Sequence, residues 1–296
     1  MFKFTKHRKI FYLLSGTLVA TSFFFLIIFG INFGIEFTGG SIMEIEYKTE
    51  RPSIDYLKGL ISEIELGEVL IQEAGEKSFI IRMGDIDDNT YRELREALGE
   101  DVVENYFKSI GSAIGNELKR SAIISIILAS LAIVIYIAFT FSGVGGKLIK
   151  SWQYGVVATG IAFFNDVLIV LGVFSFLGYF YGIQFTIPIA IALLTVLGYS
   201  INDTVVIFDR IRENISLNPR LSFDEIVDKS INNTLGRSIN TSLTTLFVLF
   251  AIFILGGETL KFFILALILG IILGTYSSIF LAGPLLVSWF KLKERK

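Results

Sequence analysis

Residues 184–208, QFTIPIAIALLTVLGYSINDTVVIF, form an apolar run of bilayer length that contains a single acidic residue, Asp203. Crossing the ~30 Å hydrocarbon core of a bilayer takes about 20 apolar residues in a helix, so this run predicts a membrane span. A charge at that depth costs about 2.5–3.5 kcal/mol on insertion scales, and such a residue usually faces a partner or a water path. Asp203 is therefore the first candidate functional residue of the chain.

The next apolar run, residues 238–255, follows directly after Arg237. Asp203 lies near the end of its own run, so the Arg237 side chain is expected on the same side of the membrane as Asp203. A carboxylate and a guanidinium that face each other between two helices can form a proton or ion relay. They can equally form a purely structural ion pair, so both interpretations remain open. Asn202, Thr204 and Thr241 place further oxygen atoms near the pair, so both H⁺ and Na⁺ are compatible with it as coupling ions.

The composition of the whole chain is typical of a membrane protein. Of its 296 residues 53% are hydrophobic, and the mean hydropathy is +0.66. The absence of cysteine excludes disulfides, and the one histidine, His7, stands among lysines as an interfacial cation rather than a metal ligand. The sequence contains no nucleotide-binding or hydrolytic constellation, so we expect no enzymatic activity, no metal or other cofactor, and no nucleic-acid partner.

Six apolar runs reach the length needed to cross a bilayer. They are residues 10–31, 122–141, 154–180, 184–208, 238–255 and 262–290. The first run is too long for the core of a signal peptide and lacks a small-residue cleavage site, so we interpret it as an anchor. The third run contains a second carboxylate, Asp166, about eleven residues from the start of its helix and therefore near mid-bilayer.

The distribution of Lys and Arg predicts the orientation. With the N-terminus in the cytoplasm, the segments on that side hold 15 of the 26 Lys and Arg residues, whereas the two short outer turns hold only Lys261. Because positive charge accumulates on the cytoplasmic side of membrane proteins, both termini are expected there.

Residues 32–118 are the one long hydrophilic stretch, and this topology places them outside the cytoplasm. They carry 19 Asp and Glu residues against 8 Lys and Arg residues, an acidity that serves solubility or collects cations. The predicted parts are residues 1–31 with the first span, the outer domain 32–118, and residues 119–296 with spans two to six.

Strand and helix patterns alternate along the outer domain. Strands are expected at residues 43–47, 68–74, 77–83 and 101–108, and helices at 54–64 and 91–98. The order β-α-β-β-α-β is that of the split βαβ or ferredoxin-like arrangement. The predicted fold is a polytopic α-helical membrane protein with six transmembrane helices and one extracytoplasmic α+β ferredoxin-like domain between helices one and two.

Small residues recur every fourth position on the last predicted span, at Gly270, Gly274 and Ser278. Such stripes let helices approach closely, and packing is the role we expect. Between spans four and five, residues 222–225 match a capping box and precede an apolar stripe. We interpret this segment as a short helix that lies on the cytoplasmic surface.

A glycine-rich string, Gly34-Ile35-Glu36-Phe37-Thr38-Gly39-Gly40, follows the first span directly. Its glycines permit positive φ or close backbone contact where the chain leaves the bilayer. The spacing matches neither a P-loop nor a dinucleotide fingerprint, so an exit turn is favoured over a phosphate cradle.

This string resembles the GIDFTGG signature of the SecD/SecF protein-export family. Residues 198–214, GYSINDTVVIFDRIREN, resemble the fourth-helix motif of the SecF branch, and residues 237–242, RSINTS, resemble the start of its fifth helix. The likeness extends over essentially the whole chain. The glycine string alone would not separate the two branches, whereas the fourth-helix motif is specific.

The resemblance implies a subunit of a bacterial cytoplasmic (inner) membrane that contacts the lipid bilayer, pairs with SecD and joins the SecYEG channel. Such a subunit uses the proton-motive force to promote export of unfolded polypeptides, and Asp203 and Arg237 match the family's intramembrane pair. Asn165 stands where many relatives carry His, which excludes a titrating role for that position. The alternatives are a small-molecule exporter of the resistance-nodulation-division type and a translocon scaffold without energy transduction.

Overall fold

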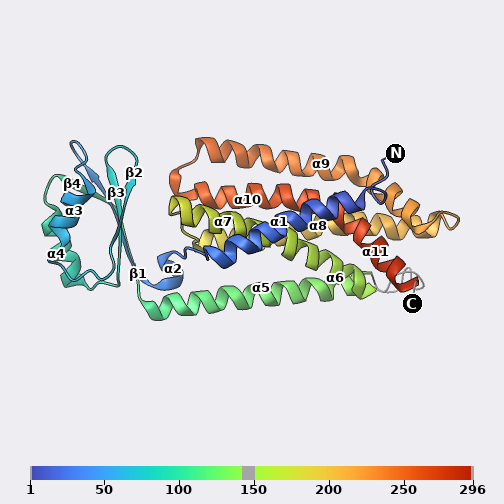
Figure 1. Ribbon diagram of the computed structural model, residues 1–296, viewed down its shortest axis with the longest axis horizontal. Coiled ribbons are helices and arrows are strands. Elements are labelled where there is room, and N and C mark those ends of the chain that lie inside the picture. The colour runs from blue at the N-terminus through green and yellow to red at the C-terminus, as the bar shows by residue number, and fades with distance from the viewer. Residues whose placement is uncertain (1, 142–150, 295–296) are drawn as a thin grey trace. The chain divides into compact units, whose positions relative to one another are not determined.

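The computed structural model describes residues 2–141 and 151–294 (Figure 1). The chain divides into two compact units, Phe33–Ile124 and Met1–Asn32 together with Ser125–Lys296. We refer to the first as the sheet unit and to the second as the helical unit.

The sheet unit contains four antiparallel strands in the order β2-β3-β1-β4. Its strands are β1 (Gly40–Tyr47), β2 (Leu70–Ala74), β3 (Ser78–Met83) and β4 (Val102–Ile110), and its first three helices are α2 (Ile35–Thr38), α3 (Ile54–Ile61) and α4 (Asp88–Leu98). The chain order β1-α3-β2-β3-α4-β4 with this sheet order is the ferredoxin-like arrangement, which confirms the prediction.

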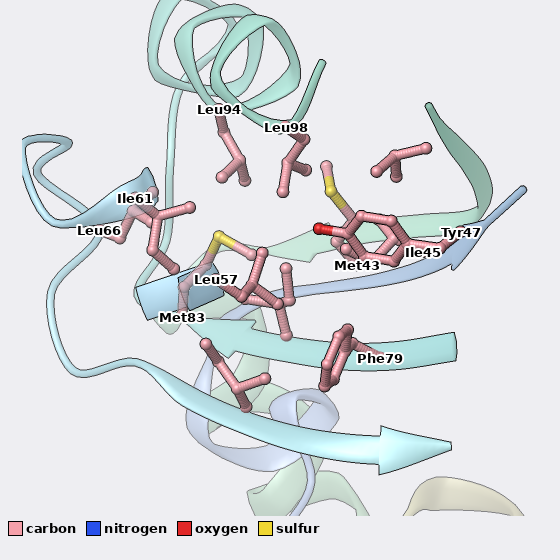
Figure 2. Packing of buried hydrophobic residues seen from close by; sticks show 13 residues of the cluster. Met43, Ile45, Tyr47, Leu57, Ile61, Leu66, Phe79, Met83, Leu94 and Leu98 are labelled. Carbon is pink, nitrogen blue, oxygen red and sulfur yellow. The ribbon is translucent and has the colours of Figure 1, made fainter. Parts of the chain in front are cut away.

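One face of the sheet and two helices enclose the core of this unit (Figure 2). Met43 and Ile45 of β1 and Phe79 of β3 point to this face, where Leu57 of α3 and Leu94 of α4 pack against them. All five side chains are 0% exposed. The two-residue periodicity of the strands therefore places their apolar side chains under the helices.

Side-chain caps determine where both helices begin. Ser53 Oγ accepts the N–H of Tyr56 at 3.3 Å before α3, and Asp87 Oδ1 accepts the N–H of Thr90 at 2.9 Å before α4. A cap of this kind satisfies a backbone donor that has no partner within the helix. The start signal at Ser53 thus leads to the observed helix.

Six helical segments of the described chain are long and apolar enough to cross a membrane, as predicted, so this is a multi-pass membrane protein. Four are single helices: α1 (Arg8–Ile28), α5 (Ser112–Thr140), α8 (Ile187–Leu217) and α9 (Phe223–Leu255). The other two contain a π-helical turn: span three comprises α6 (Ser151–Ile161), η1 (Ala162–Val167) and α7 (Leu168–Tyr181), and span six comprises α10 (Glu258–Ser277), η2 (Ser278–Ala282) and α11 (Gly283–Glu294).

Spans three, four and six form the interior of the helical unit. There α10 packs against both α8 and α9, and η1 contacts α8 and α10. On another side α1 packs along α7, where a Cβ added to Gly172 would lie 2.4 Å from Ser22 Cβ. Close helix contacts of this kind need a residue without a side chain.

The segment that begins at Ser222 starts a long helix rather than a short one. The capping box forms, with Ser222 and Glu225 bonding each other reciprocally, but α9 then continues without a break to Leu255. The prediction of a separate surface helix is wrong because the apolar stripe packs inside the protein, where Val227 and Ile231 are 0% exposed. A single glycine within the segment lowers helix stability without ending the helix.

Candidate functional site

Asp166 lies in the interior of the helical unit and is 0% exposed. Asn165 Nδ2 donates to its Oδ1 at 3.0 Å, Ser277 Oγ donates to its Oδ2 at 3.0 Å, and Ser200 Oγ makes a second hydrogen bond to Oδ2. These donors come from η1, α10 and α8. A buried carboxylate without partners would be strongly destabilising, so the three donors make Asp166 tolerable at this depth.

Two of the three spans that supply this cluster contain a π-helical turn. Asp166 belongs to η1, and Ser277 immediately precedes η2. A π-helical turn departs from the regular α-helical register, and such turns recur at functional sites. The two turns therefore mark this region of the bundle independently of its charge.

Further hydroxyl groups extend the polar region. Ser15 Oγ of α1 donates to Asn165 Oδ1, so the amide is held on both sides. Ser278 Oγ pairs with Thr204 Oγ1 at 2.8 Å and donates to the carbonyl oxygen of Ser200 at 3.2 Å. The helical unit thus contains a connected set of buried hydroxyl and amide groups around one carboxylate.

Asp203 of α8 lies half-buried and uses only one of its two carboxylate oxygens. Ser238 Oγ of α9 donates to Oδ1 at 2.6 Å, whereas Oδ2 is buried without a hydrogen-bond partner. A buried polar atom without a partner bears the full cost of its lost hydration. Asp203 Oδ2 can therefore accept a further hydrogen bond.

Arg237 does not bind Asp203 in this structure. It lies exposed on α9, and among the described residues none of the ion pairs involves it. The next residue, Ser238, donates its hydroxyl hydrogen bond to Asp203 instead. The predicted pair is thus brought to adjacent helices without being joined in this conformation.

Asn202 and Thr241, which were expected beside that pair, are exposed as well. Thr241 Oγ1 donates to the carbonyl oxygen of Arg237 at 2.9 Å, and Asn240 and Thr244 are exposed on the same helix. These exposed residues form a polar face on α9. Polar groups that face lipid are unfavourable, so contact with another polar surface would stabilise this face.

One stretch of α8 contacts Asp166 and also carries Asp203. Ser200, which binds Asp166, precedes Asp203 by three residues and so shares its side of the helix. The predicted site residues do not include Ser200, Ser238 or Ser277, because a serine within an apolar run has the pattern of a small packing residue. The spacing of Ser200 from Asp203 is the one signal that could have identified it.

The small-residue stripe of span six lies against α8. A Cβ added to Gly270 would lie 2.2 Å from Val196 Cγ2, and one added to Gly274 would lie 2.9 Å from Ser200 Cβ. Ser278 continues the stripe with its hydrogen bonds to α8. This close approach brings the hydroxyl groups of α8 and α10 within reach of one carboxylate.

The glycine string runs from Gly34, before α2, to Gly40, at the start of β1. Phe37 within it is buried, and Gly39 and Gly40 have positive φ angles of 77° and 119°. A Cβ on Gly39 would lie 2.6 Å from Ser112 Cα, and one on Gly40 would lie 2.8 Å from a carbonyl oxygen of β3. Backbone atoms already fill the space beside these glycines, which favours the exit turn over a phosphate cradle.

Among the described residues no group of three or more His, Cys, Asp or Glu side chains could hold a metal ion. The oxygen atoms near the two carboxylates come instead from single serine and threonine hydroxyls and from backbone carbonyls. Carboxylates accept protons, and carbonyl groups at helix irregularities coordinate Na⁺ in membrane transporters.

Known proteins resemble this chain over nearly its whole length. The family described as "Protein export membrane protein SecD/SecF, C-terminal" matches residues 90–292, and the one described as "SecD/SecF GG Motif" matches residues 24–50. "Protein translocase subunit SecF" of Thermobaculum terrenum is 39% identical, covering 98% of this chain and 94% of the relative. The protein of the same name from Rhodothermus marinus is 38% identical, covering 97% and 92%.

A fused relative and a solved structure extend the likeness. "Protein translocase subunit SecDF" of Thermus thermophilus is 37% identical over 88% of this chain and 35% of its own length. The crystal structure of SecDF, "a translocon-associated membrane protein", from Thermus has a TM-score of 0.84 at 34% identity, covering 97% of this chain and 38% of that one. By its sequence and its fold, this chain belongs to the SecD/SecF protein-export family.

Proposed function

We propose that this protein is the SecF-type subunit of the Sec export machinery, which promotes movement of unfolded polypeptides across the bacterial cytoplasmic membrane. The relatives that match nearly end to end are named protein translocase subunit SecF, and they support this role. The fused SecDF of Thermus supports a SecD partner, because this chain corresponds to only 35% of that protein. The SecYEG channel completes the proposed assembly, with both termini in the cytoplasm and the sheet unit outside.

The observation that carries the energetic part of the proposal is the state of Asp203. One carboxylate oxygen binds Ser238 and the other is buried without a partner, inside a bundle that crosses the membrane. Such a group gains or loses a proton, or a sodium ion, with a large change in its interactions. Moving one charge across the membrane is worth about 2.3 kcal/mol per 100 mV, enough to bias a conformational equilibrium.

The proposed switch exchanges the partner of Asp203. With the carboxylate neutralised by H⁺ or Na⁺, Ser238 is a sufficient partner, as in the geometry described above. With the carboxylate charged, Arg237 one residue earlier on α9 is the stronger partner, and rotation of α9 would bring it inward. Asp166 stays bonded to its three donors and holds α8 against α10 while this happens.

The exposed polar face of α9 supports the position of the partner subunit. Six spans are half of a pseudo-symmetric transporter, and the second half commonly packs against the first around the ion site. Arg237, Asn240, Thr241 and Thr244 would then face SecD rather than lipid.

Export and assembly should both be measured for Asp203→Asn, a nearly isosteric change that removes the titrating group. We expect normal co-purification with the partner subunit and loss of most export activity. Asp209→Asn is the matched control, since Asp209 lies exposed six residues further along α8, in an ion pair with Arg212 at 3.6 Å. If export persists in the Asp203 variant, the protein is a scaffold and not a transducer.

A further inference from the structure

A charged pocket of about 450 Å³ lies where the N-terminal segment meets α9 and α11. Five cations and three acids line it: Lys3, Lys6, Arg8, Lys9 and Lys291, with Asp224, Glu225 and Asp228. All of these residues belong to the helical unit. The pocket is at the end of the bundle where α1 begins, so it lies at a membrane surface.

The three acids of this pocket already have partners within the protein. Asp228 accepts both the N–H and the hydroxyl of Thr5, each at 2.9 Å. Asp224 pairs with Lys291 at 2.7 Å and with Arg8 at 3.6 Å. Glu225 serves the N-terminal cap of α9. These contacts hold the three acids in place within the pocket.

Lys3, Lys6 and Lys9 are the cations that remain. All three are exposed, and among the described residues no ion pair involves them. Clusters of basic residues beside a membrane span attract anionic lipid headgroups, by about 1 kcal/mol for each cation near the surface.

A second, apolar cavity of about 800 Å³ lies between α1, α6 and α11. Its walls include Val19 of α1, Gly160 and Phe164 near the end of span three's first half, and Leu285 and Trp289 of α11. It therefore opens within the membrane-spanning part of the bundle, where hydrocarbon is the surrounding medium.

One face of α1 joins the two spaces. Arg8 lines the charged pocket and Ser15 and Val19 line the apolar cavity, and these residues share a face with Tyr12 between them. Seven residues of helix separate the pocket from the cavity, about 10 Å along the axis. Tyr12 bonds Ser288 of α11 at 3.0 Å at the junction.

Aromatic residues stand at the same level. Trp289, in the wall of the cavity, packs edge-on against Trp152 with ring centroids 5.6 Å apart. Tryptophan and tyrosine concentrate where the lipid headgroups meet the acyl chains. The order along α1 is thus cationic, aromatic and then apolar, which is the order of a phospholipid molecule.

We infer that the charged pocket and the apolar cavity together bind one anionic phospholipid. Its phosphate lies among Lys3, Lys6 and Lys9, and one acyl chain occupies the cavity beside Gly160. The inference requires that the helical unit spans a membrane, and it is independent of the proposed export function.

Native mass spectrometry of the full-length protein in mild detergent tests this site. The probes are a phosphatidylglycerol and a phosphatidylcholine with identical acyl chains, and excess inorganic phosphate is the arm that represents a free anion. We expect the wild type to retain phosphatidylglycerol about a hundredfold better than phosphatidylcholine, at about 1 kcal/mol for each of the three lysines. Lys3→Gln/Lys6→Gln/Lys9→Gln should remove the preference between the two lipids.

The chain offers a matched pair of variants for the cavity. A Cβ at Gly160 meets no atom within 4 Å, so Gly160→Leu fills the cavity without a backbone clash. Retention of phosphatidylglycerol should fall about tenfold, the effect of losing contact with about two methylene groups. Gly16→Leu is the control, because Gly16 is equally free of neighbours and lies outside both lined spaces.

Three outcomes would overturn the inference. Equal retention of the two lipids by the wild type would remove the headgroup site. Equal losses for Gly160→Leu and Gly16→Leu would remove the acyl-chain site. Displacement of phosphatidylglycerol by inorganic phosphate would show that the lysines bind a free anion.

Discussion

Asp166 and Asp203 are the two carboxylates within the six apolar runs of the sequence, and their hydrogen bonding separates their roles. Asp166 is fully buried with three donors on its two oxygens, whereas Asp203 has one donor and one unpartnered oxygen. A group whose partners are complete has little to gain from a change of state. Asp166 therefore suits a fixed point of the bundle, and Asp203 suits the group that changes.

Removing one donor from Asp166 should destabilise the bundle. We expect Ser277→Ala to cost about 0.5–1.5 kcal/mol, the usual net value of a hydrogen bond, and to lower the thermal unfolding midpoint in detergent. Ser130→Ala is the control, because Ser130 Oγ is buried without any partner. Equal midpoints for the two variants would show that Asp166 does not depend on Ser277.

The cap of α4 makes one feature of the sheet unit depend on pH. The backbone N–H and then the hydroxyl of Thr90 hold the pKa of Asp87 below its ordinary value of 3.8. Because the folded pKa is lowered, the cap contributes fully above the ordinary value and is lost as the pH falls through the lowered one. Amide exchange in α4, corrected for intrinsic rates, should therefore show protection that decreases in acid.

Asp87→Asn tests this pH dependence, because asparagine caps a helix without titrating. The variant should lose less protection between neutral and acidic pH than the wild type does. Asp88→Asn, one residue later, should behave as the wild type. A wild-type profile that Asp87→Asn leaves unchanged would assign the acid sensitivity to another group.

At the scale of elements, contact between helices depends on a few glycines. Gly172 lies against the backbone of Ser22, with an added Cβ 2.6 Å from Ser22 Cα. Gly172→Ala should separate α1 from α7 and cost about 1–3 kcal/mol, as overpacking does. Gly198→Ala, where an added Cβ meets nothing within 4 Å, should leave the thermal midpoint unchanged or raise it. Equal thermal midpoints for both variants would mean that α1 and α7 can move apart without loss of stability, which would contradict this prediction.

The elements also show what could be predicted from the sequence and what could not. Apolar length predicts all six spans, and alternating periodicity predicts the order of strands and helices around residues 43–47 and 54–64, because both signals are local. The turns η1 and η2 have no such local signal, and neither is predicted from the residues around Asp166 or Ser278. The same holds for the hydroxyl partners, which come from helices far apart in the chain.

The molecule as a whole places its charges asymmetrically, and this asymmetry predicts its orientation. Cysteine introduced singly at Ser53 and at Ser222 should react with an impermeant thiol reagent from opposite sides of the membrane, since both positions are exposed and the chain has no cysteine. A background without added cysteine is the control for labelling. Reaction of both positions from one side would contradict the proposed topology.

In the proposed function, Asp203 couples export to the ion gradient. The most direct measurement compares export of a precursor by membrane vesicles before and after the proton-motive force is collapsed, at two pH values and with and without Na⁺. In the wild type, collapse of the coupling gradient should lower export severalfold. If collapse of the proton-motive force lowers export without Na⁺, the coupling ion is H⁺; if omission of Na⁺ lowers export to the same extent, the coupling ion is Na⁺. Asp203→Asn should export slowly and respond to neither treatment. Wild-type rates with wild-type sensitivity in that variant would contradict the account.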